Sequence, residues 1–371
     1  MMHIRQLLFV SFLLPGAAGA QAPSPAKDVQ VPSAVRDAYQ GAWEVSTTQD
    51  AEKLEQIPDA ALFSAPKANL DAFRQQRNDA LIRGKGELTP ADRDLLKQQF
   101  TALEAIDPQG FDTHLAGYHL LFPDQKAFGH LEAAVAQDAD RPELIAPRLV
   151  SAVRSGDRVA FEWWGKALKE KDHVAPGLWA AAKDLLLSVD QDGVLITAGE
   201  MDAYPTWGLQ AASGERRDVL VVDERLLADP AYRQRVWTDA RCVGPVPTST
   251  EALIAALPGS SPRPVFLSMA LGGRIDPSWE DELYVTGTAF RFSETPFDNI
   301  PVLEMRWVDL KKPMDAGPLS RNYLVPAVVL LKHFRAVGDE AGVARMERSV
   351  RALAQQLKVT NELYRTGILQ H

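Results

Sequence analysis

The sequence predicts an α/β protein with α-helical repeats, in which a Rossmann-like parallel sheet domain is flanked by helical-hairpin segments of the tetratricopeptide type. Three observations lead to this prediction. Apolar residues recur at helical spacing through residues 33–190, short β-branched runs alternate with helical stretches over 191–300, and two helical runs close the chain. Hydrophobic residues make up 46% of the 371 residues and charged residues 24%, which is the composition of a globular protein.

The first 20 residues have the composition of a secretory signal peptide. Arg5 supplies a basic start, Leu7–Leu14 forms a short apolar core, and small residues follow up to Ala20. The apolar core is too short to span a bilayer, so we expect cleavage after Ala20, with Ala22 as the alternative. We therefore expect a periplasmic protein without a membrane span once the signal is removed.

Residues 21–32 are polar and contain Pro, and we expect a flexible leader there.

Composition also argues against several classes of protein. The single cysteine, Cys242, excludes a disulfide framework and a Cys-rich zinc site. A formal net charge of −9 argues against nucleic acid as a partner, because nucleic-acid-binding proteins usually carry a basic excess.

Residues 33–190 are expected to form a helical repeat-like domain. Thr89 and Pro90 are a helix-start signal, with Thr as the N-cap and Pro at the first helical position, and Asp107-Pro108 ends that helix. Shorter helices separated by Pro, Gly or Asp are predicted at about 110–121, 124–137, 141–154, 157–170 and 176–189. Consecutive short helices are typical of stacked helical hairpins.

Residues 191–300 are expected to form the Rossmann-like α/β domain. Its strands are predicted as apolar runs at 194–197, 219–222, 264–268, 284–286 and 289–292. Helical stretches separate the first three of these runs, at about 203–213, 230–238 and 249–257. Because this alternation is typical of parallel sheets, we expect parallel strands covered by helices.

Residues 301–371 are expected to be a linker and a C-terminal helical hairpin. Residues 301–317 contain two prolines and are predicted to be irregular. Helices are predicted over 318–337 and 340–357, with Gly338-Asp339 as the turn between them.

The segment Val194–Gln210 reads as an apolar strand followed, from Gly199, by Gly-Glu-Met-Asp-Ala-Tyr-Pro-Thr-Trp-Gly-Leu-Gln. It resembles a motif of bacterial protein O-mannosyltransferase-like membrane proteins, which span the membrane many times and carry a soluble C-terminal region. Their motif is Gly-Asp-Asn-Asp-Thr-(Phe or Tyr)-Pro-Leu-Trp-Tyr-x-Gln. The segments Arg217–Leu227, Arg263–Ser268 and Leu283–Phe292 resemble later strands of the same region.

This resemblance covers residues 190–355 and implies a soluble α/β domain with tetratricopeptide-like helices. Two departures bear on function. Glu200-Met201-Asp202 stands where the family has Asp-Asn-Asp, so the amide is lost. The membrane-embedded half, in which the family's proposed sugar transfer resides, has no counterpart here. The resemblance therefore implies a fold and a domain rather than a transferase activity.

A ligand site is predicted at the carboxyl ends of the strands, where ligands of open α/β sheets bind. The candidate ligand-binding residues, which follow the first three strands, are Glu200, Asp202, Tyr204, Trp207, Asp223 and Arg274. Carboxylates, an arginine and aromatic faces suit a glycan, which takes hydrogen bonds at its edges and apolar contact on its face. The structural alternative is that Asp202 only caps the next helix and Trp207 only packs in the core.

The sequence contains no pattern that predicts a catalytic residue, a cofactor or a metal. No Gly-x-Ser-x-Gly elbow occurs, and the acidic residues after the first strand would repel a phosphate group. His114, His119 and His130 lack the spacing of a metal pair on one helix.

We therefore expect an exported, non-catalytic binding or scaffold protein of the bacterial cell envelope, because extended helical surfaces usually bind other molecules. The expected partner is an envelope protein or a glycan. The alternative is a glycan-acting enzyme that uses Asp202 and Glu200 as acid or base.

Overall fold

The computed structural model describes residues 69–84, 88–171 and 174–370. The expected signal peptide, the leader and the start of the helical domain lie outside these ranges. None of the helices within them is long and apolar enough to cross a membrane.

The first half of the described chain is helical, as the sequence predicts. Its helices are α4 (Leu70–Arg83), α5 (Pro90–Ile106), α6 (Phe111–Leu121), α7 (Gln125–Gln137), α8 (Ile145–Ser155), α9 (Arg158–Glu170) and α10 (Pro176–Leu187). The start of α5 is a capping box, in which the Thr89 hydroxyl accepts the Asp92 N–H and the Asp92 carboxylate accepts the Thr89 N–H. From α4 to α9, each helix packs on the next, most closely α6 on α7 and α8 on α9, whereas α9 and α10 each pack against α11 (Glu200–Ser213). Their reading as tetratricopeptide units stays a prediction.

The centre of the molecule is a five-stranded mixed sheet with the order β2-β1-β3-β5-β4. The strands are β1 (Val194–Thr197), β2 (Leu220–Asp223), β3 (Val265–Ser268), β4 (Leu283–Val285) and β5 (Ala289–Phe292). β1 runs parallel to β2 and β3, whereas β5 is antiparallel to β3 and β4. The expectation of a wholly parallel sheet is therefore wrong at β5, which runs antiparallel to both of its neighbours. Residues 286–288, which join β4 to β5, are too few for a parallel crossover and form a hairpin instead.

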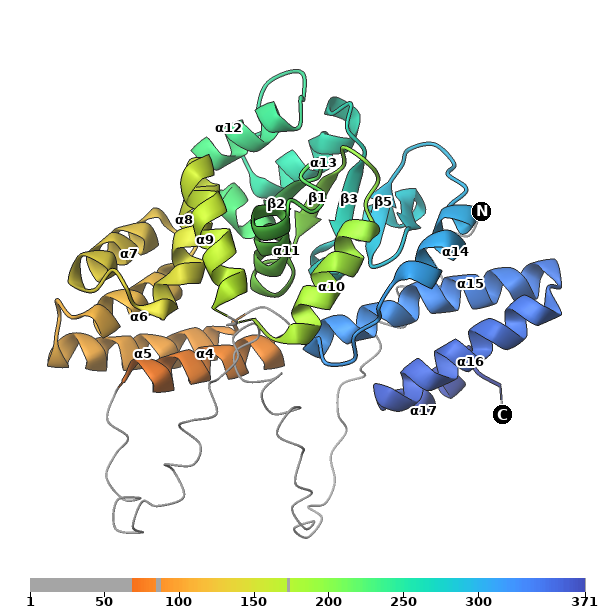
Figure 1. Ribbon diagram of the computed structural model, residues 1–371, viewed down its shortest axis with the longest axis horizontal. Coiled ribbons are helices and arrows are strands. Elements are labelled where there is room, and N and C mark those ends of the chain that lie inside the picture. The colour runs from red at the N-terminus through yellow and green to blue at the C-terminus, as the bar shows by residue number, and fades with distance from the viewer. Residues whose placement is uncertain (1–68, 85–87, 172–173, 371) are drawn as a thin grey trace, which may run out of the picture.

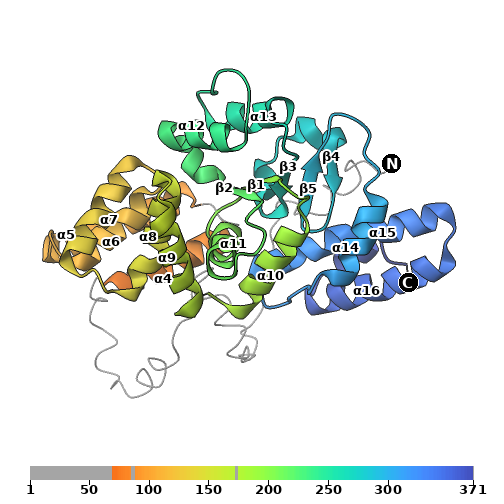
Figure 2. The same ribbon diagram turned by 45° about the horizontal axis from the view of Figure 1, so that its top comes forward.

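Helices cover both faces of the sheet. α11 (Glu200–Ser213) joins β1 to β2, and α12 (Pro230–Asp239) and α13 (Thr250–Ser260) lie between β2 and β3. Figure 2 shows α10 and α11 on one side of the sheet and α12 and α13 on the other. Every residue of β1 and β3 is buried, which explains why their sequences are continuous apolar runs rather than alternating ones.

A single arginine ties together the amino ends of the three parallel strands. The Arg263 guanidinium donates to the backbone carbonyls of Asp192 at 2.8 Å, Gly193 at 3.0 Å, Asp218 at 2.7 Å and Asp239 at 2.9 Å. These bonds join the segments that lead into β1, β2 and β3 to one another and to the end of α12.

The C-terminal part contains α14 (Ile300–Asp309), α15 (Leu324–Val337), α16 (Glu340–Gln356) and α17 (Thr360–Arg365). The expectation of an irregular link over 301–317 is therefore wrong for its first half. Pro301 occupies the first turn of α14, where a missing N–H breaks no helical hydrogen bond, and Ile300 and Leu303 are buried. α15 begins later than expected, after a 3-10 turn at Gly317–Tyr323.

The C-terminal part is fastened to the rest of the chain through Asp184 in α10. The fully buried Asp184 carboxylate accepts the backbone N–H groups of Lys311 at 2.8 Å and Lys312 at 2.9 Å, and the Tyr323 hydroxyl at 2.8 Å. One hydrophobic core runs through the described residues from Leu70 in α4 to Leu369. Figure 1 shows the sheet between α4–α9 on one side and α14–α17 on the other.

Candidate functional site

The loops that follow β1, β2 and β3 meet at the carboxyl end of the sheet. Arg225, after β2, lies with Nη1 3.4 Å from Oε1 of Glu200, the first residue of α11. Arg274, after β3, donates to the Ala198 carbonyl at 3.2 Å and forms an ion pair with Glu224. The loops expected to form a crevice thus do meet, and their charged side chains contact one another and fill the space between them.

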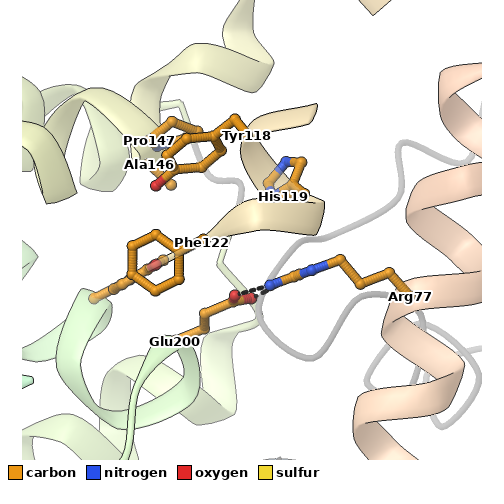
Figure 3. Close-up of a pocket in the computed structure, with 8 residues that line it drawn as sticks. Arg77, Tyr118, His119, Phe122, Ala146, Pro147 and Glu200 are labelled. Atoms are coloured by element: carbon orange, nitrogen blue, oxygen red, sulfur yellow. Dashed lines mark hydrogen bonds and ion pairs between the residues drawn. The ribbon is translucent and has the colours of Figure 1, made fainter. Parts of the chain in front are cut away.

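Glu200 is buried in this crevice and pairs with an arginine from a distant helix. The Arg77 guanidinium, on α4, donates from Nη1 to Oε2 at 3.3 Å and also from Nη2 to Oε1 (Figure 3). Burial alone would raise the pKa of the Glu200 carboxyl, but the charge and hydrogen bonds of Arg77 and the charge of Arg225 hold the pKa well below its usual value. Glu200 therefore carries a negative charge balanced by two arginines.

Asp223 is wholly buried at the end of β2, and both of its oxygens bind Arg225. Its Oδ1 accepts the Arg225 backbone N–H and Nε at 3.0 Å each, and its Oδ2 accepts Nη2 at 2.6 Å. The same guanidinium donates to the Tyr204 hydroxyl at 3.3 Å and lies 4.8 Å from the ring centre of Phe122. Burial raises the pKa of Tyr204, so the phenol keeps its proton. Acidic and basic side chains thus alternate from Arg77 through Glu200 and Arg225 to Asp223, and the rings of Tyr204 and Phe122 pack against Arg225.

Asp202 starts α11 by accepting backbone N–H groups. Its carboxylate accepts the N–H groups of Ala198 and Gly199 at 2.9 Å each, and it also makes a hydrogen bond with the Ser268 side chain. Burial raises the pKa of Asp202, while these hydrogen bonds oppose the rise. The cap lets α11 begin at once after β1, earlier than the 203 expected from sequence.

Gly199 makes the turn between β1 and α11 possible for two reasons. Its φ of 140° is a conformation that side chains disfavour. A Cβ there would also lie 2.6 Å from Cζ of Arg225, in the space that the guanidinium occupies. A larger residue would therefore displace the arginine that pairs with both buried carboxylates.

Trp207 and Tyr204 are buried between α11 and the sheet rather than lining an open wall. Trp207 is 2% exposed and donates from Nε1 to the Val221 carbonyl at 3.3 Å. Its ring stacks on Tyr204 with the ring centres 5.8 Å apart. Gln210, one turn further on, donates to the carbonyls of Arg216 and Val219 at 2.9 Å each. These residues bind α11 to β2.

The free space beside these residues is small. The two best-formed pockets within the described ranges have free volumes of about 10 Å³ each. One lies between Arg77, Phe122 and Glu200, and the other lies beside Asp202 and Ser268. A single water molecule needs about this volume, so neither pocket accepts a sugar ring as it stands.

Sequence reasoning missed the two arginines that define the site. Arg225 had a local signal, because it follows Asp223 by two residues in the loop after a strand. Arg77 had none, since 123 positions separate it from Glu200 and nothing in α4 marks its direction. Of the residues chosen from sequence, Glu200, Tyr204 and Asp223 meet around Arg225, whereas Trp207 packs inward against β2. Asp202 lies beside a separate small pocket.

Comparison with known proteins identifies one domain. A family model described as TMEM260-associated domain 2 matches residues 179–253, from α10 through β1, α11, β2 and α12 into α13. The matched segment thus contains Glu200, Asp202 and Asp223, but not Arg77 or Arg274. Comparison with curated proteins and with solved structures gives no match.

Proposed function

We propose that the protein is an exported, non-catalytic binding or scaffold protein of the bacterial cell envelope, and that its partner is a protein. One observation carries the proposal: the carboxylates of the crevice are engaged inside the chain. Glu200 pairs with Arg77 and Arg225, Asp223 pairs with Arg225, and Asp202 accepts two backbone N–H groups. A general acid or base must instead reach a proton on a substrate.

The family match is to a model described as TMEM260-associated domain 2, and it supports the α/β domain that the resemblance implies without naming a partner. We propose that the sheet is Rossmann-like, because β2, β1 and β3 are parallel and α11 forms the first crossover. We also propose that the flanking helices are tetratricopeptide-like hairpins and that residues 1–20 are the export signal. A protein in the periplasmic fraction that still carries residues 1–20 would contradict their assignment as a cleaved signal, and a protein that stays in the cytoplasm would contradict export.

The partner surface that we propose is the outer side of α9. Val159 is 82% exposed and Trp163, one turn later, is 68% exposed, while the opposite side of α9 packs against α8 and α11. Exposed tryptophan is enriched at protein interfaces, where it contributes a large share of binding energy. A protein partner therefore fits this surface better than a glycan fits the filled crevice.

Site-specific photo-crosslinking in the periplasm tests the proposal. A photoreactive residue replaces Val159 in the full chain, and a matched chain carries it at Val243, which is 75% exposed on another part of the molecule. We expect a protein adduct of one reproducible mass from position 159, absent from position 243 and absent when Trp163→Ala is added. Equal labelling at both positions would contradict the proposal, and a glycan adduct at 159 would replace the protein partner by a glycan.

The alternative of a glycan-acting enzyme makes a different prediction. It requires Asp202 or Glu200 to reach a glycosidic bond, so Asp202→Asn and Glu200→Gln would each abolish glycan turnover by the full chain. Turnover by the unaltered protein that both variants lose, while remaining folded, would favour the enzyme over the scaffold.

A further inference from the structure

Two histidines that lie 16 positions apart meet on the helical side of the molecule. His114 on α6 and His130 on α7 have their Nδ1 atoms 3.2 Å apart, and both side chains are partly buried. Two protonated Nδ1 atoms would repel each other at this distance. In the metal-free pair, therefore, one Nδ1 donates a hydrogen bond and the other accepts it.

We infer that this pair binds a divalent transition metal ion through both Nδ1 atoms. Zinc is held by imidazole nitrogen at about 2.0–2.1 Å, and tetrahedral geometry then sets two ligand nitrogens about 3.3 Å apart. The observed separation of 3.2 Å matches this value. Binding requires a tautomer in which both protons sit on Nε2, so that both Nδ1 lone pairs can be directed at the ion.

The His130 ring is held in place by its surroundings. It rests on the backbone of α6 at Gly117, where a Cβ would lie 2.7 Å from the ring's Nδ1. The edge of the ring also meets Phe100, with ring centres 5.9 Å apart. A ligand that is already fixed loses little conformational freedom when it binds, which favours affinity.

The donor set indicates which ions would bind. Imidazole nitrogen suits zinc, copper and nickel and is a poor ligand for magnesium or calcium. No group of three or more His, Cys, Asp or Glu positioned to hold a metal occurs in the described part of the chain. Water would therefore complete the coordination. The ion would clamp α6 to α7.

Titration of the full chain with zinc and with copper tests the inference. After chelator treatment, we expect calorimetry to show about one ion per chain at this site, and zinc to raise Tm. His114→Gln and His130→Gln should each weaken binding by at least tenfold. His333→Gln, on α15, is the matched control and should bind as the unaltered chain does. Gly117→Ala should also weaken binding, because it pushes the His130 ring aside.

A second measurement does not depend on the folding of any variant. Electron paramagnetic resonance of the copper-loaded, unaltered chain should show two equivalent nitrogen ligands. Binding that persists in both His114→Gln and His130→Gln, or a copper spectrum without two nitrogens, would overturn the inference, as would the absence of binding at millimolar zinc.

Discussion

The Asp202 carboxylate accepts hydrogen bonds from the backbone around it, so removing it should lower the free energy of unfolding. In Asp202→Ala, two buried N–H groups lose their acceptor, and we expect the free energy of unfolding to fall by about 2 kcal/mol. Asp157→Ala is the control, because Asp157 caps α9 at an exposed site and its loss should cost about 1 kcal/mol. Urea unfolding measures the free energy of unfolding of both variants. Unchanged stability of Asp202→Ala together with loss of a bound partner would instead make Asp202 a binding residue.

Two tryptophans provide a matched comparison of core and surface. Trp207→Ala should lower the free energy of unfolding by roughly 3–5 kcal/mol, because it empties a buried site between α11 and β2. Trp163→Ala should change it by less than about 0.5 kcal/mol, since that ring is largely exposed. Thermal and urea unfolding report both values. Similar small losses for the two variants would mean that Trp207 lines an accessible wall.

The ion pair between Arg77 and Glu200 joins α4 to α11, which is a link between elements. Glu200→Gln keeps the size of the side chain but leaves buried Arg77 without its counter-charge, and we expect a loss of roughly 3–5 kcal/mol at neutral pH. Glu143→Gln serves as the control, because the pair that it breaks with Arg141 is more exposed and should contribute about 1 kcal/mol or less.

The same pair sets a pH dependence whose sign follows from the pKa of Glu200. That pKa is lowered in the folded chain, so the unfolded chain takes up the proton first as pH falls. The contribution of the pair is complete above the unfolded pKa of about 4.3 and declines as pH falls toward the folded value. The stability gap between the unaltered protein and Glu200→Gln should therefore narrow from pH 7 to pH 3. A gap that widens on acidification would refute the assignment.

Elements with strong local signals were predictable from sequence, and those set by distant contacts were not. Thr89-Pro90 specifies the start of α5, and the continuous apolar runs specify β1 and β3, through local sequence alone. The prolines of residues 301–317 predict an irregular link, although Pro301 lies in the first turn of α14, where proline favours a helix. The antiparallel pairing of β5 depends on a short hairpin that alternation alone does not reveal. The ligand site at the strand ends stays a prediction, and Arg77, which pairs with Glu200 there, comes from a helix 123 positions away that the local sequence does not point to.

At the scale of the molecule, the described residues share one core although the sequence suggested separate domains. Because the cluster is continuous from α4 to the C-terminal helices, we expect a single cooperative unfolding transition. Tryptophan fluorescence and far-UV circular dichroism should give coincident midpoints, and Glu200→Gln should shift both together. Two resolved transitions would show that the helical part and the sheet unfold independently.

The two ends of the sheet are held by ties of different chemistry. At the amino ends of the strands, Arg263 binds neutral carbonyl groups, and arginine keeps its proton at every accessible pH. At the carboxyl ends, the tie between α4 and α11 is the ion pair of Arg77 with the ionised carboxylate of Glu200. In strong acid, below the usual pKa of a glutamate, the Glu200 tie should therefore weaken while the Arg263 tie at the opposite end of the sheet stays, so that α4 separates from α11 first.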